Sequence, residues 1–271
     1  MVAITLLTSA LLATAALAAP SSRDRLQSRL SRRSSGSHLS TPNQRITDKG
    51  LTPGLTTEAT TGYSSNWAGP VYNAAAGTFK AVTGTFTVPT PAAPSGGSTR
   101  TSYAASAWVG IDGDSCETSI LQTGLDFTVE NGRVSYDAWY EWYPDYAYDF
   151  SGITFAAGNE VKITVTATST TSGTAVVENL TTGETVTQEI TSTAALCEQD
   201  AEWIVEDFTE GDSLVPFANF GTVTFTTAEA TTSSGSTEGP SGATYIYDIE
   251  QNNKVLTSVT TSTSGTTIKY V

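Results

Sequence analysis

Histidine is almost absent from this sequence. The 271 residues include a single histidine, His38, and only two cysteines. Ser-His-Asp and Cys-His nucleophile systems require an imidazole as base, so a hydrolase built from the rest of the chain must work without one. The same scarcity leaves too few nitrogen and sulfur ligands for a transition-metal site, and we expect neither a metal nor another cofactor.

Basic residues are scarce as well. From residue 59 onward, six lysines and arginines stand against 24 aspartates and glutamates, which gives this part a net charge of −18. Such acidity disfavours binding to nucleic acids or anionic membranes, and we expect neither as a partner. It either serves solubility alone or adapts the protein to acid, where carboxylates take up protons and their mutual repulsion falls.

Long apolar runs are missing except at the N-terminus. Residues 2–18 read VAITLLTSALLATAALA and end in the small-residue pattern Ala16-Leu17-Ala18. This stretch is typical of a signal peptide and is too short for a stable membrane helix. We therefore predict that residues 1–18 are a signal peptide and that the protein is secreted and extracellular.

Aromatic residues are absent from residues 19–58, which are rich in serine and carry seven basic residues against three acidic ones. A segment of this composition cannot bury a core, so we predict a pro-segment whose end lies between Lys49 and Tyr63. Because this segment is basic and the following domain is acidic, we hypothesise that it docks on the domain as an inhibitor that acid releases. Binding that is no better at neutral than at acid pH would contradict this hypothesis.

The cysteine count predicts the redox state. Cys116 and Cys197 are the only two cysteines, and in a secreted chain such a pair favours one disulfide. The alternative is two buried free thiols. A cysteine-rich zinc site is excluded in either case.

Residues 59–271 have the length and the pattern of a single all-β domain. Apolar and polar residues alternate over residues 161–166, which is the period of a half-buried strand. Strand-like stretches lie at residues 78–88, 160–167, 175–179, 184–191, 223–227, 244–249, 254–259 and 266–271. No long helical period occurs, so we predict a sandwich of two antiparallel sheets over one core, of the jelly-roll or lectin-like kind.

A glycosylation sequon lies on a predicted turn of this domain. The triplet is Asn179-Leu180-Thr181, followed by the turn residues Thr182-Gly183. Such triplets are common by chance, and we treat Asn179 as a candidate glycosylation site.

The residues with chemical potential concentrate between 106 and 142 and near residue 206. Gln122 lies in the apolar sequence ILQTG, where an amide needs hydrogen-bond partners; it is either a core glutamine or a donor to an oxyanion. Glu206 lies in AEWIVEDF, where burial would raise its pKa as proton transfer in acid requires. A paired structural carboxylate is the alternative, and Glu202 and Asp207 compete for the same role.

Tryptophans accompany these polar residues. Trp108, Trp139 and Trp142 either line a substrate groove or fill the core of the sandwich. Strand alternation places Trp139 and Glu141 on one face and Trp142 on the other, and we predict that the face with Glu141 is the groove side.

The longest of these motifs resemble the fungal glutamic peptidases, or eqolisins. They are WVGIDGDSCETSILQTG, YDAWYEWYP, DFSGITF, ENLTTGETV, AEWIVEDF and PFANF. The similarity covers nearly all of residues 63–227, with a looser match in the tail that ends in SGTTIKYV. The resemblance implies a sandwich of two curved antiparallel sheets with about seven strands each, and acid endopeptidase activity on proteins. A monomer is the expected default for a secreted digestive enzyme.

The resemblance also assigns roles to residues of this chain. The family's catalytic glutamine falls on Gln122 and its catalytic glutamate on Glu206. Its substrate-binding residues fall on Trp108, Asp112 and Glu141. Its shared disulfide would join Cys116 to Cys197. In the implied mechanism Glu206 activates a water, Gln122 stabilises the oxyanion, and Glu206 returns the proton to the leaving amine.

Three other interpretations remain open from the sequence. A jelly-roll glycoside hydrolase would use Glu141 and Glu206 and would not need Gln122. A carbohydrate-binding sandwich would need only the aromatic residues. An aspartic dyad drawn from Asp112, Asp126 or Asp137 would be inhibited by pepstatin, whereas a glutamic peptidase should be insensitive to it.

Overall fold

The computed structural model describes residues 38–46 and 59–271. The predicted signal peptide and the predicted pro-segment residues 19–37 and 47–58 lie outside the described residues. Within the described part, the chain forms β-strands and one three-residue 3-10 helix, η2 (Pro240–Gly242). No helix in this part is long and apolar enough to cross a membrane.

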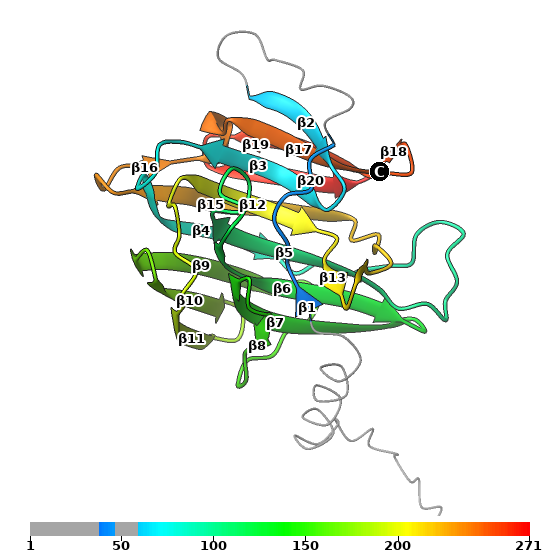
Figure 1. The fold of residues 1–271 in the computed structure, drawn as a ribbon. Helices are drawn as coiled ribbons and strands as arrows, with labels where there is room; N and C mark the ends of the chain where they lie inside the picture. The colour runs from blue at the N-terminus through cyan, green and yellow to red at the C-terminus, as the bar shows by residue number, and fades with distance from the viewer. Residues whose placement is uncertain (1–37, 47–58) are drawn as a thin grey trace, which may run out of the picture. The chain divides into compact units, whose positions relative to one another are not determined.

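Two large sheets make up the domain (Figure 1). The first runs in the order β11 (Glu184–Thr191), β10 (Ser172–Asn179), β9 (Glu160–Ser169), β4 (Phe79–Thr87), β15 (Thr222–Thr232), β20 (Gly265–Tyr270) and β19 (Thr257–Ser262), with β16 (Thr237–Glu238) paired to β15. All of these pairs are antiparallel. The eight stretches predicted as strands from the sequence belong to this sheet or to β17 (Tyr245–Gln251) and β18 (Lys254–Val255) of the second sheet.

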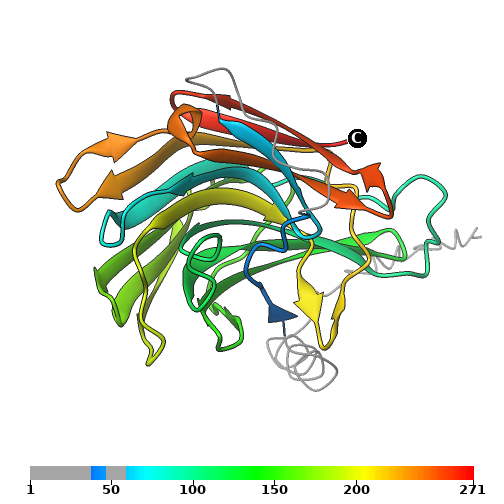
Figure 2. The ribbon, with the colours of Figure 1, turned by 45° about the horizontal axis from the view of Figure 1, so that its top comes forward.

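The second sheet contains the motifs around Trp108, Gln122, Glu141 and Glu206. It runs in the order β18 (Lys254–Val255), β17 (Tyr245–Gln251), β3 (Trp67–Asn73), β12 (Asp200–Glu206), β5 (Tyr103–Ile111), β6 (Ile120–Glu130), β7 (Arg133–Tyr143) and β8 (Tyr148–Asp149). Strand β2 (Thr60–Ser64) pairs with β17 in parallel. Both sheets are curved (Figure 2), and the prediction of an all-β sandwich is confirmed.

A small third sheet lies beside the second one. It consists of β1 (His38–Leu39), β13 (Thr209–Glu210) and β14 (Ser213–Leu214). Strand β1 comes from the predicted pro-segment, and its residues His38 and Leu39 pair with Glu210 and Thr209. Residues 38–46 are therefore bound to the domain, although their composition gave no sign of structure.

The core lies between the two large sheets. Every second residue of β5 and β12 enters it, among them Ala107, Val109 and Trp203, and the facing sheet contributes Phe86 and Phe225. Trp142 also packs into this core, whereas Trp139 belongs to a separate apolar cluster. The alternation predicted for β7 is therefore confirmed, and it divides the second sheet into a core face and an opposite face.

We call this opposite face of the second sheet the site face. It carries a second buried apolar cluster. The members of the cluster are Trp67, Val71, Trp108, Ile120, Trp139, Ile204 and Tyr247. Two glycines make room for it, because a Cβ atom on Gly124 would lie 2.5 Å from the Cβ atom of Trp108, and one on Gly110 would lie 2.8 Å from the Trp108 ring.

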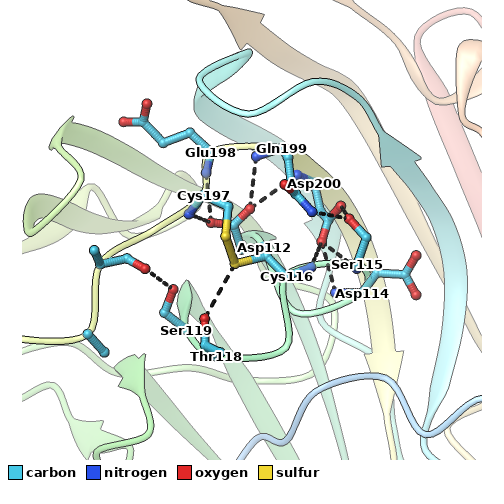
Figure 3. Close-up of a disulfide and its surroundings, with 12 residues drawn as sticks. Asp112, Asp114, Ser115, Cys116, Thr118, Ser119, Cys197, Glu198, Gln199 and Asp200 are labelled. Carbon is cyan, nitrogen blue, oxygen red and sulfur yellow. Dashed lines mark hydrogen bonds between the residues drawn. A yellow bond between two sulfur atoms is a disulfide. The ribbon is translucent and has the colours of Figure 1, made fainter.

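A disulfide between Cys116 and Cys197 joins the loop after β5 to the approach to β12 (Figure 3). Buried carboxylates reinforce the join in both directions. Asp112 accepts hydrogen bonds from the backbone N–H groups of residues 197–200, and Asp200 accepts from those of residues 114–116. The predicted disulfide is confirmed, and these bonds fix β12 in register beside β5.

Replacing both cysteines by serine should destabilise the domain by about 2–4 kcal/mol, because the bond closes a loop of 81 residues that the unfolded chain would otherwise leave open. Urea unfolding of the double variant and the wild type at acid pH would measure this difference. Coincident unfolding curves would show that the carboxylate bonds of Asp112 and Asp200 hold the two loops without help.

Candidate active site

Two polar side chains from neighbouring strands lie side by side in the middle of the site face. Gln122 of β6 and Glu141 of β7 are direct cross-strand partners, and both are fully buried. Glu206, the last residue of β12, is buried on the same face, two strands away from β6. Strand alternation thus brings together residues that are far apart in the sequence.

Residues 38–46 run in an extended conformation across the strands of the second sheet (Figures 1 and 2). Three hydrogen bonds place them on the side chains described above. The N–H group of Ser40 donates to Oε2 of Glu141 at 3.1 Å. The N–H group of Thr41 donates to Oε1 of Glu206 at 3.2 Å. The carbonyl oxygen of Ser40 accepts a hydrogen bond of 3.3 Å from Nε2 of Gln122.

The contacts of Gln122 and Glu206 meet on one peptide group. The carbonyl oxygen of Ser40 and the nitrogen of Thr41 belong to the same planar amide, and each binds a different one of the two side chains. Gln122 and Glu206 therefore reach the two ends of a single peptide bond. The arrangement places an amide donor at the carbonyl oxygen and a carboxyl group at the nitrogen.

Glu206 is held by donors on both of its oxygens. Nε1 of Trp108 donates to Oε2 at 2.8 Å, and Nδ2 of Asn66 donates to Oε1 at 3.3 Å. With residues 38–46 in place, burial raises the pKa of Glu206 to about 7, and the donors around it, among them Ser40, oppose this rise. Trp108 thus acts here as a support for Glu206.

Glu141 is fully buried as well. Burial raises its pKa well above the ordinary value, and His38 and the N–H group of Ser40 counteract the rise in part. A second carboxyl group, that of Glu206, adds to the cost of ionising it. Glu141 is therefore held mainly in its neutral form while the segment covers it.

His38 brings a positive charge to the site. Its Nδ1 atom lies 3.0 Å from Oδ2 of Asp126, and its ring packs against the rings of Trp139 and Phe208 at centroid distances of 5.0 and 4.3 Å. Burial lowers the pKa of His38, but Asp126, together with Glu141 and Glu206, outweighs this and raises it to about 9. The imidazole is therefore protonated at neutral pH.

The other half of the segment is anchored on Asp114. Nδ2 of Asn43 donates to Oδ1 of Asp114 at 2.7 Å, and the Arg45 guanidinium lies 2.6 Å from Oδ2. The same guanidinium lies over the rings of Tyr245 and Tyr247. The segment is thus held by charge at both ends, with the Ser40–Thr41 peptide between them.

The carboxylate of Asp112, which the family resemblance assigns to substrate binding, is bound to the backbone near the disulfide. All four backbone donors described above use its carboxylate, and burial raises its pKa to about 6. It follows Trp108 by four residues of extended chain, a distance of about 13 Å. These contacts favour a role in holding residues 197–200 over the predicted contact with substrate.

Glu202 and Asp207, which competed with Glu206 for the acid-base role in the sequence analysis, lie at other positions. Glu202 precedes Glu206 by four residues, about 13 Å along the same strand, and is fully buried. Asp207 accepts a hydrogen bond from Nε2 of Gln251 at 2.6 Å. Of these three, Glu206 is the one that contacts the peptide bound by Gln122.

The aspartates considered for a dyad occupy two places. Asp126 and Asp137 are cross-strand partners in β6 and β7, and Asp126 also accepts from Nε1 of Trp139 at 2.8 Å. Asp112 lies at the disulfide. Within the described part, the one group with metal-ligand spacing is Asp112 with Cys116 and Cys197, whose sulfur atoms are joined to each other.

Asn66 and Asp114 are site residues that the sequence-based reasoning missed. Asn66 contacts both Glu206 and residues 41, 42 and 44, but it lies in a Ser- and Asn-rich stretch without any motif. Asp114 lies in the stretch 106–142, where the sequence analysis found most of the residues with chemical potential. The positive charges of residues 19–58 could have suggested that one of them pairs with a buried carboxylate of the domain.

The sequon residue Asn179 is fully buried. Its Nδ2 atom donates to the carbonyl oxygen of Thr154 at 2.8 Å and to Oδ1 of Asn159 at 3.1 Å. A glycan on Nδ2 would replace these bonds, so glycosylation would have to precede the folding of this turn. Modification of Asn179 stays a prediction.

By fold and site, this is a β-sandwich protein built to hold an extended peptide chain against a buried amide and two buried carboxyl groups. Comparison with known proteins identifies it further. Residues 65–270 match the Peptidase A4 family, and the chain belongs to that family. It is a glutamic-type endopeptidase, and the assignment to the fungal glutamic peptidases is confirmed.

Three relatives show how far the similarity extends. The chain is 52% identical to Aspergillopepsin-2 of Aspergillus niger over 98% of its own length and 99% of that protein's. It is 44% identical to Scytalidopepsin B of Scytalidium lignicola, over 75% of this chain and 76% of the relative. A crystal structure of scytalido-glutamic peptidase with a transition state analog inhibitor superposes with a TM-score of 0.69 at 41% identity, over 76% of this chain and 98% of that one.

The buried carboxyl groups predict that the fold is most stable in acid. Burial raises the pKa of Asp112 to about 6, of Glu206 to about 7 and of Asp207 to about 8, and it raises that of Glu202 well above the ordinary value. Unfolding lets these groups ionise at their ordinary pKa values. Their stabilising contribution is therefore complete below about pH 4 and is lost as the pH rises through the folded-state values.

Melting temperatures of the Glu206→Gln chain should accordingly fall between acid and neutral pH. Glu202→Gln in this background should recover on the order of 1–3 kcal/mol at neutral pH, because neither oxygen of Glu202 has a hydrogen-bond partner within the described residues. Glu189→Gln on exposed strand β11 is the matched control and should change nothing. Equal pH profiles for the two variants would contradict this explanation.

Proposed function

We propose that this protein is a secreted acid endopeptidase that hydrolyses peptide bonds in proteins with Gln122 and Glu206 and without a covalent intermediate. The observation that carries the proposal is the peptide group of Ser40 and Thr41, bound at its oxygen by Gln122 and at its nitrogen by Glu206. Two features support secretion: the predicted signal peptide at 1–18 and the disulfide, which requires an oxidising compartment.

The proposed reaction uses each side chain at the atom it reaches. Ionised Glu206 takes a proton from a water, and the oxygen of this water attacks the carbonyl carbon. Gln122 donates its amide N–H to the developing oxyanion. Glu206 then gives the proton to the nitrogen of the leaving amine, and the carbon–nitrogen bond breaks.

The pKa of Glu206 fits this cycle once the segment has left. The value of about 7 applies with residues 38–46 over the site, and burial is its largest cause. Water that enters the uncovered site reduces the cost of ionisation, so the pKa falls toward the acid range. The hydrogen bond from Trp108 stabilises the ionised form in both states.

Trp108 and Glu141 keep the roles near substrate that the family implies. A peptide in the place of residues 38–46 would pass over Glu141, which would receive the N–H group of the same residue that carries the scissile carbonyl. Trp108 would orient Glu206 through its indole N–H. Asp112 would act through the loop at 197–200.

The same contacts support the pro-segment as an inhibitor. Residues 38–46 cover Gln122, Glu141 and Glu206, which excludes another peptide from these side chains. The carboxyl groups that face the segment are Asp114, Asp126, Glu141, Glu206 and Glu210. Acid protonates carboxylates, and this removes their attraction for His38 and Arg45. The released enzyme would act as a monomer.

Gln122→Ala should lower kcat on denatured protein at acid pH by about 10²–10³-fold, because one oxyanion donor is lost. Glu206→Gln should abolish hydrolysis, because the proton acceptor is lost. The matched control is Gln188→Ala on the exposed strand β11, which should retain full activity. Circular dichroism would verify that all three variants are folded.

Substantial activity in Glu206→Gln, or strong inhibition of the wild type by pepstatin, would contradict the proposal and favour a pair of aspartates. If the wild type released sugar from polysaccharides and the Gln122→Ala variant released it at the same rate, the glycoside hydrolase that uses Glu141 and Glu206 would be favoured instead.

His38→Ala should weaken inhibition at neutral pH, because it removes the imidazolium that pairs with Asp126. A synthetic peptide of residues 37–46 carrying this change should inhibit the processed enzyme at least ten-fold less well than the natural peptide. Gln44→Ala, at an exposed position of the same peptide, is the control. Equal inhibition by all three peptides would show that the ion pair contributes nothing.

A further inference from the structure

The segment that covers the site is bound in the way a substrate would be. Its peptide group between Ser40 and Thr41 presents the carbonyl oxygen to Gln122 and the nitrogen to Glu206. In the proposed reaction these are the atoms that receive the oxyanion donor and the returning proton. An inhibitor that merely blocked the groove could lie in either direction, with any of its atoms at these side chains.

Neighbouring peptide bonds are not placed in this way. The carbonyl oxygen of Thr41 accepts from Nε1 of Trp67 at 3.0 Å and from Nδ2 of Asn66 at 3.3 Å. The bond between Thr41 and Pro42 also has no N–H group to bind Glu206. On the other side, Leu39 is paired with Thr209 in the small sheet. Among the peptide bonds of residues 38–46, the Ser40–Thr41 bond is the one that contacts both Gln122 and Glu206.

We propose that the enzyme cuts its own chain between Ser40 and Thr41, as an intramolecular reaction in acid, once the weakened contacts of the bound segment have let water reach Glu206 and allowed it to ionise. The inference rests on the proposed function, because it uses Gln122 and Glu206 in the same roles. The oxygen of one water forms a bond to the carbonyl carbon of Ser40, and the bond from this carbon to the Thr41 nitrogen breaks. Ser40 gains a carboxyl group and Thr41 a free amino group, and Glu206 carries the proton from the water to that amine.

The cut would divide the contacts of the segment into two sets. The part up to Ser40 keeps His38 with Asp126, the pairing of β1 with β13, and the N–H bond of Ser40 to Glu141. The part from Thr41 keeps Asn43 and Arg45 on Asp114 and remains linked to the domain through the chain. Before the cut, each set holds the other in place. Afterwards, residues 1–40 are a separate peptide that dilution can remove.

The experiment uses the full-length chain, prepared at neutral pH and shifted to acid together with a denatured protein substrate. Samples quenched over time are examined by intact mass and by sequencing of new N-termini. The first new N-terminus should be Thr41, with a complementary fragment that ends at Ser40. Its rate of appearance should stay unchanged when the precursor is diluted 100-fold, because the reaction is intramolecular.

Two variants of the cut position sharpen the test. Thr41→Pro removes the N–H group that binds Glu206, and cleavage after Ser40 should become at least 100-fold slower. Thr41→Val keeps that N–H group at similar size and should be cut at Ser40 at nearly the wild-type rate. Glu206→Gln should leave the precursor intact.

The outcomes separate the two proposals. If the added substrate is digested while the first cut falls elsewhere, or while the rate at Ser40 rises with precursor concentration, self-cleavage at this bond is wrong and the proposed function stands. If neither the substrate nor the precursor is cut at any acid pH, the proposed function fails and the inference fails with it. Cleavage of Thr41→Pro at the wild-type rate would also overturn the inference.

Discussion

The structure depends on keeping carboxyl groups buried on one face of a sheet with hardly any cations to pair with them. Ionised, such groups are costly to bury, and the chain meets this constraint in two ways. Backbone N–H groups donate hydrogen bonds to the carboxylates of Asp112 and Asp200 near the disulfide. Glu202, whose carboxyl oxygens have no hydrogen-bond partner within the described residues, avoids the cost by being protonated. Protonation of Glu202 favours acid conditions, and for Asp112 burial outweighs the N–H donors and raises the pKa to about 6. The preference for acid therefore follows from the fold as well as from the chemistry.

Residues 38–46 supply what the site lacks at neutral pH. They bring backbone N–H groups to Glu141 and Glu206 and two cationic side chains to Asp126 and Asp114. They also place an ordinary peptide bond between Gln122 and Glu206, so inhibition and substrate binding use the same atoms. Acid weakens the contact of Arg45 by protonating Asp114, whose pKa burial raises. In the proposed function, acid thus both uncovers the site and brings the enzyme into the range where we expect it to be most stable.

The sequence predicted the sandwich because strand alternation is a local property, and it predicted the disulfide because only two cysteines exist. Residue patterns alone could not join Gln122 to Glu206, since sheet order decides which strands become neighbours; the family resemblance did this. It also placed Asp112 in the groove, whereas the hydrogen bonds of its carboxylate serve residues 197–200. Charge alone suggested that the basic pro-segment docks on the acidic domain. Which of its residues bind, and to which side chains, could not be predicted, because the conformation of residues 38–46 is set by the domain and not by a core of their own.

The most direct test of this account is a crystal structure of the full-length Glu206→Gln precursor at neutral pH. The account predicts residues 38–46 on the site face, with the carbonyl oxygen of Ser40 within hydrogen-bonding distance of Gln122 and the nitrogen of Thr41 beside residue 206. His38 should contact Asp126 in the same crystal. A segment that lies elsewhere, runs in the opposite direction or presents a different peptide bond to Gln122 would contradict the account.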